Sequence, residues 1–557
     1  MRLPKFRDLT QAQKDVYLYA PNDAHVLVAG PPGTGKTLIA CFRAVELQKR
    51  EVPVVLCMFN RVLAKYASNA GDGQETVLTV RTVRQWFLHW WKHAGLPPRS
   101  QGSDIRVGAS YEDRVAVKAA GARWHKDVWC PWRGKKGAWV VRIDEWNEVS
   151  NRFSEWTALQ DPPAHPDANS EYDWDAICEH VMDHSDILSE ASVSPGTLLI
   201  DEGQDFPPGF YRFLRLLSAI GSSRKATHPL RCMVLADENQ QLTQFNSTLN
   251  DIQSALKITA EHRYQLLDNF RNTHEIAELA RQFFADVGVL PLLPDRRGEL
   301  PAFVECGGMP QCVRAIMTWV ANHPGKEVGV LVFKENKREL LHASIQAAAQ
   351  KMTGRKITVQ SYSWQSRVDN NVDDLVFDGR DVITVLNTQS CKGLEFDAVL
   401  IVDLHDSPIG SIGADRFRMQ MFVAVSRARQ WVELLESSPV QPAEPFLKEL
   451  PPAQYLRRGH APSIPAAVHV AAPIAVGKAT AVPASAIAAS AVMLPAMAST
   501  AVDWEDEAMA LAKRQGWKFE DLRPQGCFWV YAPERSPAHL PKLGFRFTAR
   551  RNGWWRT

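Results

Sequence analysis

The chain has 557 residues, and at roughly 150 residues per domain this length suggests about three or four domains. Hydrophobic residues make up 45% and charged residues 23%, which is ordinary globular usage and excludes a wholly disordered or fibrous chain. Because 64 Lys+Arg face 62 Asp+Glu, the formal net charge is only +2, so any contact with nucleic acid must use local basic patches.

The nine cysteines are scattered and show no C-x-x-C spacing, which argues against a zinc site, an iron–sulfur cluster and a secreted disulfide framework. The first residues contain no apolar stretch of the signal-peptide type. Even the alanine-rich tract around 465–500 is interrupted by prolines and polar residues, so it does not resemble a membrane span. We therefore expect a cytoplasmic protein with no membrane contact.

From residue 1 to about 447, short β-rich runs alternate with helical stretches, which predicts an α/β fold with parallel sheets. The rhythm breaks at 93–190, a Trp-rich stretch of mixed charge that we expect to be an inserted, mostly helical subdomain. Buried strands are expected at Ala24–Ala29, Val54–Met58, Thr197–Ile200, Arg231–Ala236, Val328–Phe333, Val382–Leu386 and Ala398–Val402.

The end of the chain differs in composition. Residues 448–502 are rich in Ala, Pro, Val and Ser with few charges, which is typical of a linker. Residues 503–557 carry ten Lys/Arg against seven Asp/Glu and are expected to form a small α+β module. A helix is predicted at Glu505–Gly516, and two strands joined by a turn at Ala549–Gly553. This basic, aromatic module would bind either nucleic acid or a protein partner.

A phosphate-binding loop follows the first predicted strand, where the sequence matches G-x-x-x-x-G-K-[ST] between a strand and a helix. In such a loop the glycines let backbone N–H groups surround phosphates at a helix N-terminus. Lys36 is then expected to neutralise the β- and γ-phosphates, and the Thr37 hydroxyl to bind Mg²⁺. An incidental glycine-rich turn is the alternative. The loop residues are Gly30, Pro31, Pro32, Gly33, Thr34, Gly35, Lys36 and Thr37.

Two carboxylates follow the strand predicted at Thr197–Ile200. In a nucleotide-binding sheet, an acid at the carboxyl end of a strand holds Mg²⁺, and a second one beside it orients or deprotonates the attacking water. We therefore assign Asp201 to the metal and Glu202 to the water. An acidic loop that only solvates the strand end is the alternative.

With Asp201-Glu-Gly-Gln-Asp205 the chain resembles superfamily 1 helicases of the UvrD/Rep type, and further motifs follow in that family's order. Leu9-Thr-Gln-Ala-Gln13 resembles the Q-motif, which implies that Gln13 reads the adenine edge. The segment 235–240 is similar to the G-D-x-x-Q motif with Ala236 in place of Gly, so Gln240 would sense the γ-phosphate.

Three more segments carry the resemblance into the second half of the chain. Residues 268–272 resemble the N-[YF]-R-S motif, and residues 423–428 resemble V-A-x-T-R-A, which implies that Arg271 and Arg427 contact phosphate. Residues 389–396 resemble H-S-A-K-G-L-E-F, and this similarity adds Glu395 to the nucleotide site. If both arginines reach the γ-phosphoryl group from the opposite half of the molecule, the rate of hydrolysis depends on whether the two halves are closed.

The resemblance implies two RecA-like P-loop domains that bind ATP and Mg²⁺. Only 48 residues separate Phe333 from Val382, too few for the family's large 2B insertion, so a compact form with an extra C-terminal module is expected. The implied boundaries are 1–92 with 191–262 for domain 1A, 93–190 for subdomain 1B, and 263–447 for domain 2A with a short insertion at 336–380.

Nucleic-acid contacts are implied at Phe59 and Arg61 in motif Ia, at Arg81 in motif Ib, and at Phe245 after motif III. Burial in the core is the alternative for Phe59. The family's aromatic-Arg-Gly segment is replaced here by Phe245-Asn-Ser, so the resemblance does not imply the polar contact that its arginine would make. Most tryptophans of 121–142 are expected to be structural, whereas Lys135 and Lys136 are expected in an exposed loop that contacts DNA.

The expected activity is ATP-dependent translocation on, or unwinding of, single-stranded or forked DNA, with 3′ to 5′ movement implied by the resemblance. Two alternatives stay open. One is an RNA-acting or protein-displacing translocase that does not unwind, and the other is a sensor or assembly ATPase that nucleic acid stimulates.

Overall fold

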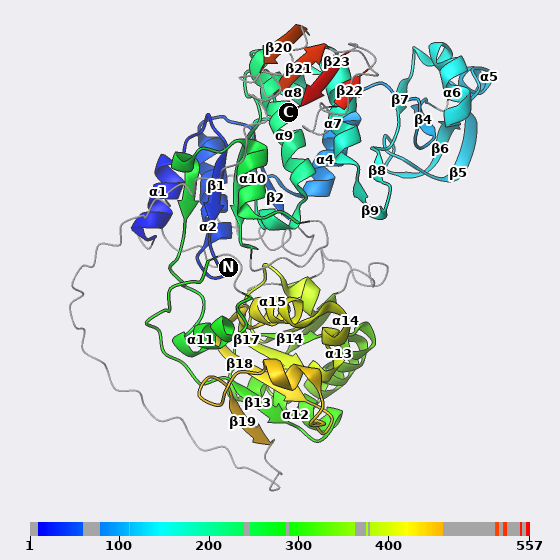
Figure 1. Cartoon of the computed structure of the whole chain (residues 1–557). Coiled ribbons are helices and arrows are strands. Elements are labelled where there is room, and N and C mark those ends of the chain that lie inside the picture. Colours follow the sequence, from blue (N-terminus) through cyan, green and yellow to red (C-terminus); the bar gives the residue numbers. More distant parts are fainter. Residues whose placement is uncertain are drawn as a thin grey trace.

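The computed structural model describes residues 9–58, 78–110, 112–238, 246–285, 289–362, 375–376 and 379–460, and the backbone of four strands between 518 and 556. Two sheets, each built of parallel strands, lie one above the other in Figure 1. The region inserted into the first half of the chain projects to one side. The predicted α/β fold with parallel sheets is confirmed, and all seven predicted strands are present with ends that differ by at most two residues.

The first sheet has six parallel strands in the order β12-β1-β11-β10-β2-β3. Short apolar runs such as Val-Leu-Val-Ala in β1 are fully buried because helices cover both faces. Its strands are β1 (Val26–Ala29), β2 (Val54–Met58), β3 (Val80–Thr82), β10 (Thr197–Ile200), β11 (Arg231–Ala236) and β12 (Arg263–Gln265). Its helices include α1 (Gln11–Tyr19), α2 (Lys36–Lys49), α4 (Val83–His93), α8 (Glu190–Val193), α9 (Pro208–Ser223) and α10 (Leu249–Leu256).

The second sheet has seven parallel strands in the order β15-β16-β14-β17-β18-β13-β19. They are β13 (Ala302–Glu305), β14 (Glu327–Val332), β15 (Thr358–Tyr362), β16 (Val382–Asn387), β17 (Phe396–Val402), β18 (Ala428–Glu436) and β19 (Arg457–His460). The helices around it are α11 (His274–Gln282), α12 (Met309–Asn322), α13 (Glu335–Gln350), α14 (Ile409–Ile412) and α15 (Ala414–Val425).

Two stretches expected outside this sheet contribute strands to it. The segment 336–380, expected as an insertion, contains most of α13 and all of β15, which pairs with β16. The segment 448–502, expected as a linker, contains β19, which pairs with β13. Both strands lie at edges of the sheet and are less apolar than the central ones, so composition alone did not mark them.

The inserted region is not mostly helical, and that expectation is wrong. Its body is an antiparallel sheet in the order β5-β6-β4-β7, with short helices α5 (Arg114–Ala119) and α6 (Ile143–Val149). The physical reason is a period-two pattern, since Ile105 and Val107 point inward from β4 while Arg106 between them stays partly exposed. The strands are β4 (Ile105–Gly108), β5 (Arg123–Cys130), β6 (Lys135–Val141) and β7 (Thr157–Leu159), followed by the small hairpin β8 (Ala164–His165) and β9 (Ala168–Tyr172).

The last helix of the inserted stretch belongs to the first half of the molecule. Helix α7 (Trp174–Asp183) packs against α9, and Trp174 lies in the same apolar core as Phe87 and Trp90 of α4. Several tryptophans therefore form an aromatic cluster under the first sheet. The tryptophans of 121–142, most of which were expected to be structural, are divided: Trp132 and Trp139 are partly buried, whereas Trp124 and Trp129 are 47% and 54% exposed.

The C-terminal strands form their own antiparallel sheet in the order β20-β21-β23-β22. They are β20 (Lys518–Leu522), β21 (Cys527–Tyr531), β22 (Arg546–Thr548) and β23 (Gly553–Arg556). The predicted strand pair around Ala549–Gly553 is confirmed, whereas the helix predicted at Glu505–Gly516 lies outside the described residues. Among the described helices, none has the length and apolar character needed to cross a bilayer.

Candidate functional site

The loop between β1 and α2 has the conformation that its glycines allow. Gly33 and Gly35 both have φ of 81°, in the left-handed region. A Cβ at Gly35 would lie 2.7 Å from the Gln13 Nε2 atom, and one at Gly33 would collide with the Asn269 side chain. The loop backbone is therefore closely surrounded by side chains from two other segments, and α2 begins directly after it at Lys36.

Lys36 is buried inside this loop. Its ammonium group donates to the carbonyl oxygens of Gly30 and of Pro31, the latter at 3.1 Å. Burial lowers the pKa of Lys36, which Asp237 and Glu202 partly oppose. The ammonium is thus preorganised within a ring of loop backbone, where a phosphate group would replace the carbonyl contacts.

Gln13 braces the same loop from α1. Its Nε2 donates to the Thr34 carbonyl at 3.0 Å, and its Oε1 accepts from the Thr10 amide at 3.1 Å. The Thr10 hydroxyl accepts in turn from the Gln13 amide, which completes a capping box at the start of α1. The structure places Gln13 against the loop, and its contact with adenine stays a prediction.

Asp201 and Glu202 follow β10 at the carboxyl edge of the first sheet. The Thr37 hydroxyl donates to Asp201 Oδ2 at 2.5 Å, so the two predicted metal ligands lie side by side. Burial, followed by the charge of Glu202, raises the pKa of Asp201. The Thr37 hydroxyl and the Asp201 carboxylate form a donor set that suits Mg²⁺. Burial of the carboxylate charge costs free energy, and a divalent cation would compensate that charge.

Glu202 has an unusual backbone, with φ of 54°, and its carboxylate accepts from Gln204 Nε2 at 2.6 Å. Gln204 also accepts from the Asp237 amide at 2.9 Å through Oε1, so Glu202 is held through β11 as well. Burial alone would raise the pKa of Glu202, but the positive charges of Lys392 and Lys36 outweigh it and lower that pKa. Glu202 is therefore an ionised, fixed group at neutral pH.

Lys392 is a site residue to which the sequence motif at 389–396 gave no role. Its ammonium lies 2.6 Å from Asp205 Oδ2 and 3.5 Å from Glu202 Oε2, and the side chain is 1% exposed. Because Lys392 follows β16 whereas both acids follow β10, this buried ion pair joins the two sheets. The sequence feature that could have pointed to Lys392 is its position three residues before Glu395, in a segment that the resemblance already ties to the nucleotide.

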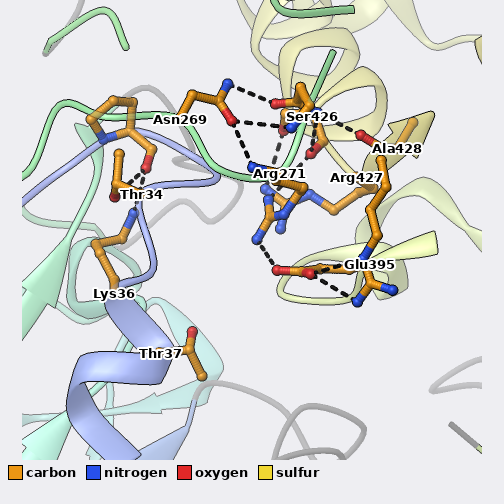
Figure 2. Close-up of polar contacts among 12 residues, drawn as sticks. Thr34, Lys36, Thr37, Asn269, Arg271, Glu395, Ser426, Arg427 and Ala428 are labelled. Carbon is orange, nitrogen blue, oxygen red and sulfur yellow. Dashed lines mark hydrogen bonds and ion pairs between the residues drawn. The ribbon is translucent and has the colours of Figure 1, made fainter. Parts of the chain in front are cut away.

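Arg271 and Glu395 form a second ion pair at the same place. Arg271 Nη2 lies 2.6 Å from Glu395 Oε1, and Arg429 Nη2 lies 3.1 Å from Glu395 Oε2. Burial would raise the pKa of Glu395, but the charges of Arg271 and then Arg429 outweigh this effect and lower that pKa to about 2. Figure 2 shows Glu395 below Arg271, with Lys36 and Thr34 on the opposite side.

Arg427 is fully buried beside this pair. Its Nε donates to the Val423 carbonyl at 3.0 Å and its Nη2 to the Ser426 hydroxyl at 3.2 Å. Burial, followed by repulsion from Arg271, lowers the pKa of Arg427 to about 10, so it stays charged at neutral pH. The charges of Glu202 and Glu395 partly oppose this shift, and a further anion beside the two arginines would oppose it more.

Two asparagines tie the loop segments together, and the sequence motifs gave neither of them a role. Asn269 Oδ1 accepts from the backbone amides of Arg271 and Asn272, both at 3.1 Å. Asn272 Nδ2 donates to the Ala428 carbonyl at 2.6 Å. The Phe270 amide donates to the Gly33 carbonyl at 2.9 Å. One short segment therefore connects the phosphate-loop region with the segment that carries Arg427.

Several of these groups line one cavity of about 400 Å³, a size within the usual range of ligand sites, whereas Asp201 and Lys392 lie outside its lining. Both predicted arginines line it together with the phosphate-loop residues. The remaining lining residues come from both halves of the chain and are Leu38, Glu202, Phe270, Gly393, Glu395 and Arg429. A cavity with three arginines and one lysine against two glutamates, together with a backbone amide loop, suits an anionic ligand such as a nucleoside triphosphate.

Other predicted residues lie elsewhere. Arg81 is on β3 at the edge of the first sheet and is partly exposed. Lys135 and Lys136 are exposed as expected, but they begin strand β6 and are not in a loop, because the turn ends at Gly134. Four predicted residues lie outside the described part of the chain: Phe59, Arg61, Gln240 and Phe245.

No protein-family model matches the chain. Among solved structures, it is similar to the C-terminal domain of a possible DNA helicase from Lactobacillus plantarum WCFS1, with 18% sequence identity and a TM-score of 0.24. The match covers 34% of this chain and 97% of that one. A similarity of this extent assigns neither a family nor a function.

Replacing Lys392 with methionine is expected to weaken the contact between the two halves by about 3 kcal/mol, because it leaves two buried carboxylates without their cation. Thermal unfolding and the radius of gyration in solution measure this effect, and we expect a lower midpoint and a larger radius. Lys337→Met is the matched control, since Lys337 pairs with Asp403 at 2.6 Å within the second half alone. Equal radii for the two variants would contradict the bridging role of Lys392.

Proposed function

We propose that the chain hydrolyses ATP in this cavity and uses the energy to move along single-stranded DNA, as a translocase or helicase built from two RecA-like halves. One observation carries the proposal: Arg271 and Arg427 line the same cavity as the phosphate loop, although the chain separates them from it by more than two hundred residues. Phosphoryl transfer needs such charges around the γ-phosphate, and a simple nucleotide-binding protein does not.

The binding roles follow from the contacts of the loop. Its backbone amides and the Lys36 ammonium would hold the β- and γ-phosphates, with the N-terminus of α2 adding its favourable dipole. Thr37 and Asp201 would hold Mg²⁺, which when bound neutralises charge that develops on the phosphate oxygens. Glu395, already fixed by Arg271 and Arg429, would face the rest of the nucleotide.

Glu202 is the group suited to the attacking water. It lines the cavity, and its low pKa keeps it ionised, so it accepts a hydrogen bond from water and orients the oxygen. Gln204 and Lys392 hold its carboxylate in place. A carboxylate with a lowered pKa is a weak base, so positioning, and not early proton removal, would be its main contribution.

The arginines give hydrolysis a mechanical consequence. Arg271 and Arg427 bring like charges to one cavity, which Glu202 and Glu395 partly offset, and a triphosphate bound by both arginines would favour the closed arrangement. Loss of the γ-phosphate would weaken this binding and favour opening. A cycle of closing and opening between two halves is the motion that would step a motor along a strand.

The direct test is the rate of ATP hydrolysis with and without single-stranded oligothymidylate in the presence of Mg²⁺. We expect the strand to stimulate hydrolysis at least tenfold, because contact with the strand should favour the closed cavity. Displacement of streptavidin from the 5′ end, but not the 3′ end, of a biotinylated strand is expected for 3′ to 5′ movement. A rate indifferent to every nucleic acid would overturn the proposal. Stimulation without directional displacement would indicate a sensor ATPase.

A further inference from the structure

A second cavity lies in the inserted region, between helix α5 and strands β5 and β6. Its volume is about 790 Å³, well above that of the nucleotide cavity. Its chemistry is also different, because it combines two indoles with three cations. The lining side chains are Ala109, Ser110, Val115 and Ala119 with the indoles of Trp124 and Trp139 and the cations of Arg114, Lys118 and Arg133, and none of these described lining residues is acidic.

Trp124 is fixed in place and yet open to solvent. Its ring meets the Trp139 ring edge-on, with centroids 5.4 Å apart, and the Arg133 guanidinium lies 4.9 Å from its centroid. Gly137 has φ of 100°, and a Cβ there would lie 2.7 Å from the Trp124 ring, so only glycine lets the indole lie over this backbone. Despite these contacts Trp124 stays 47% exposed. A rigid indole with an open face costs little entropy when a flat ligand stacks on it.

The cations surround this indole from two elements. Lys118 lies on the exposed side of α5, and Arg133 lies in the turn between β5 and β6. Arg123, on the same strand as Trp124, pairs with Glu145 at 2.8 Å on the surface, and Arg133 also donates to the Gly137 carbonyl. The positive charge at the cavity therefore comes from α5 and from the turn. Cations beside an exposed aromatic face are the combination that holds the phosphates and bases of an unpaired strand.

We propose that this cavity binds one or two nucleotides of single-stranded nucleic acid, with a base on Trp124 and the flanking phosphates on Lys118 and Arg133. A base in a duplex has both faces covered by its neighbours, so only an unpaired strand can use the indole. An acidic peptide would satisfy the cations but would leave the exposed part of the Trp124 ring without a stacking partner. The inference rests on the proposed function for its substrate class, and it adds a second grip on the strand outside the nucleotide cavity.

The test measures the affinity of the full chain for fluorescent oligothymidylate by anisotropy, without ATP. Trp124→Leu and Lys118→Glu are each expected to weaken binding about tenfold. For Lys118→Glu, the slope of log affinity against log salt should become shallower by about 0.7 for each phosphate that the variant no longer neutralises. Lys118 is exposed on α5, so its variant keeps the test valid if Trp124→Leu disturbs folding.

The matched controls are Trp129→Leu and Lys126→Glu, which change an exposed indole and an exposed cation on the same strand β5 outside the cavity. They are expected to change the affinity less than twofold. Equal losses in the controls and the cavity variants would overturn the proposal, as would unchanged affinity in Lys118→Glu or no binding by the unaltered chain. Displacement of the oligonucleotide by poly-glutamate at equal charge would assign the cavity to acidic protein segments.

The two proposals fail separately. Strand-stimulated ATP hydrolysis with unchanged binding in the cavity variants would remove the second grip and leave the motor. Binding that depends on Trp124 and Lys118, in a chain whose ATP hydrolysis ignores nucleic acid, would remove the motor and leave the binding cavity.

Discussion

Arg427→Ala is expected to lower ATP turnover by about 10³-fold, because the charge that develops on the γ-phosphoryl oxygens would lose a partner supplied from the second half of the chain. Arg427 lines the cavity, is 1% exposed and stays charged at neutral pH. ATP affinity should fall much less than turnover, since the phosphate loop is unchanged. Steady-state hydrolysis and the binding of a fluorescent ATP analogue separate the two effects.

Two further variants decide whether Arg427 acts through its charge or only through packing. Arg427→Lys keeps the charge but loses the planar fork, so it is expected to recover part of the rate. Arg418→Ala is the matched control, because Arg418 lies on α15 and pairs with Glu449 at 2.9 Å away from the cavity. A normal rate in Arg427→Ala, with intact folding, would contradict the role given to Arg427.

Lys36→Ala is expected to lower turnover by about 10²–10³-fold and, unlike Arg427→Ala, to weaken ATP binding strongly. The reason is the position of its ammonium inside the loop, where it donates to the carbonyl oxygens of Gly30 and Pro31. Burial lowers its pKa, which means that the charged form is destabilised in the folded protein without a ligand. The thermal midpoint of the ligand-free variant checks its folding, because removing Lys36 relieves this cost but also removes the hydrogen bonds to the Gly30 and Pro31 carbonyls.

The matched control is Lys49→Ala, at the exposed end of the same helix α2, which should leave ATP binding and turnover unchanged. Unaltered ATP affinity in Lys36→Ala, measured with the same fluorescent analogue, would show that this loop does not hold the phosphates.

Much of the fold was predictable because parallel strands covered on both faces are short apolar runs. The strands β1, β2, β10 and β11 of the first sheet, and the central strands of the second, stand out for this reason. Edge strands do not carry that signal. Strand β19, with the sequence Arg-Arg-Gly-His, is not apolar at all and joins the sheet only through its pairing with β13.

The inserted region was misjudged because its tryptophans serve different purposes that composition cannot separate. Trp174 belongs to the core under the first sheet, Trp146 fills the small core of the inserted sheet, and Trp124 stays half exposed on an edge strand. The alternation of buried and partly exposed residues along β4 indicates a strand, but it spans only four residues.

The candidate site, like the fold, contains some features that the sequence predicts and others that it does not. The phosphate loop and the acids after β10 were predictable, because chemistry restricts which residues stand at those places. Lys392 and Asn272 were not, since each acts through a partner more than one hundred residues away: Asp205 for Lys392, and the Ala428 carbonyl for Asn272. Spacing along the chain holds no record of such contacts, which only the folded structure brings together.

In the proposed mechanism one nucleotide is held by both halves at once. A crystal structure of the chain with Mg²⁺ and a non-hydrolysable ATP analogue would show whether this is so. We expect phosphates in the loop around Lys36, with the guanidinium groups of Arg271 and Arg427 within hydrogen-bonding distance of the γ-phosphate. A nucleotide held by the first half alone, with both arginines turned away from it, would rule out this mechanism.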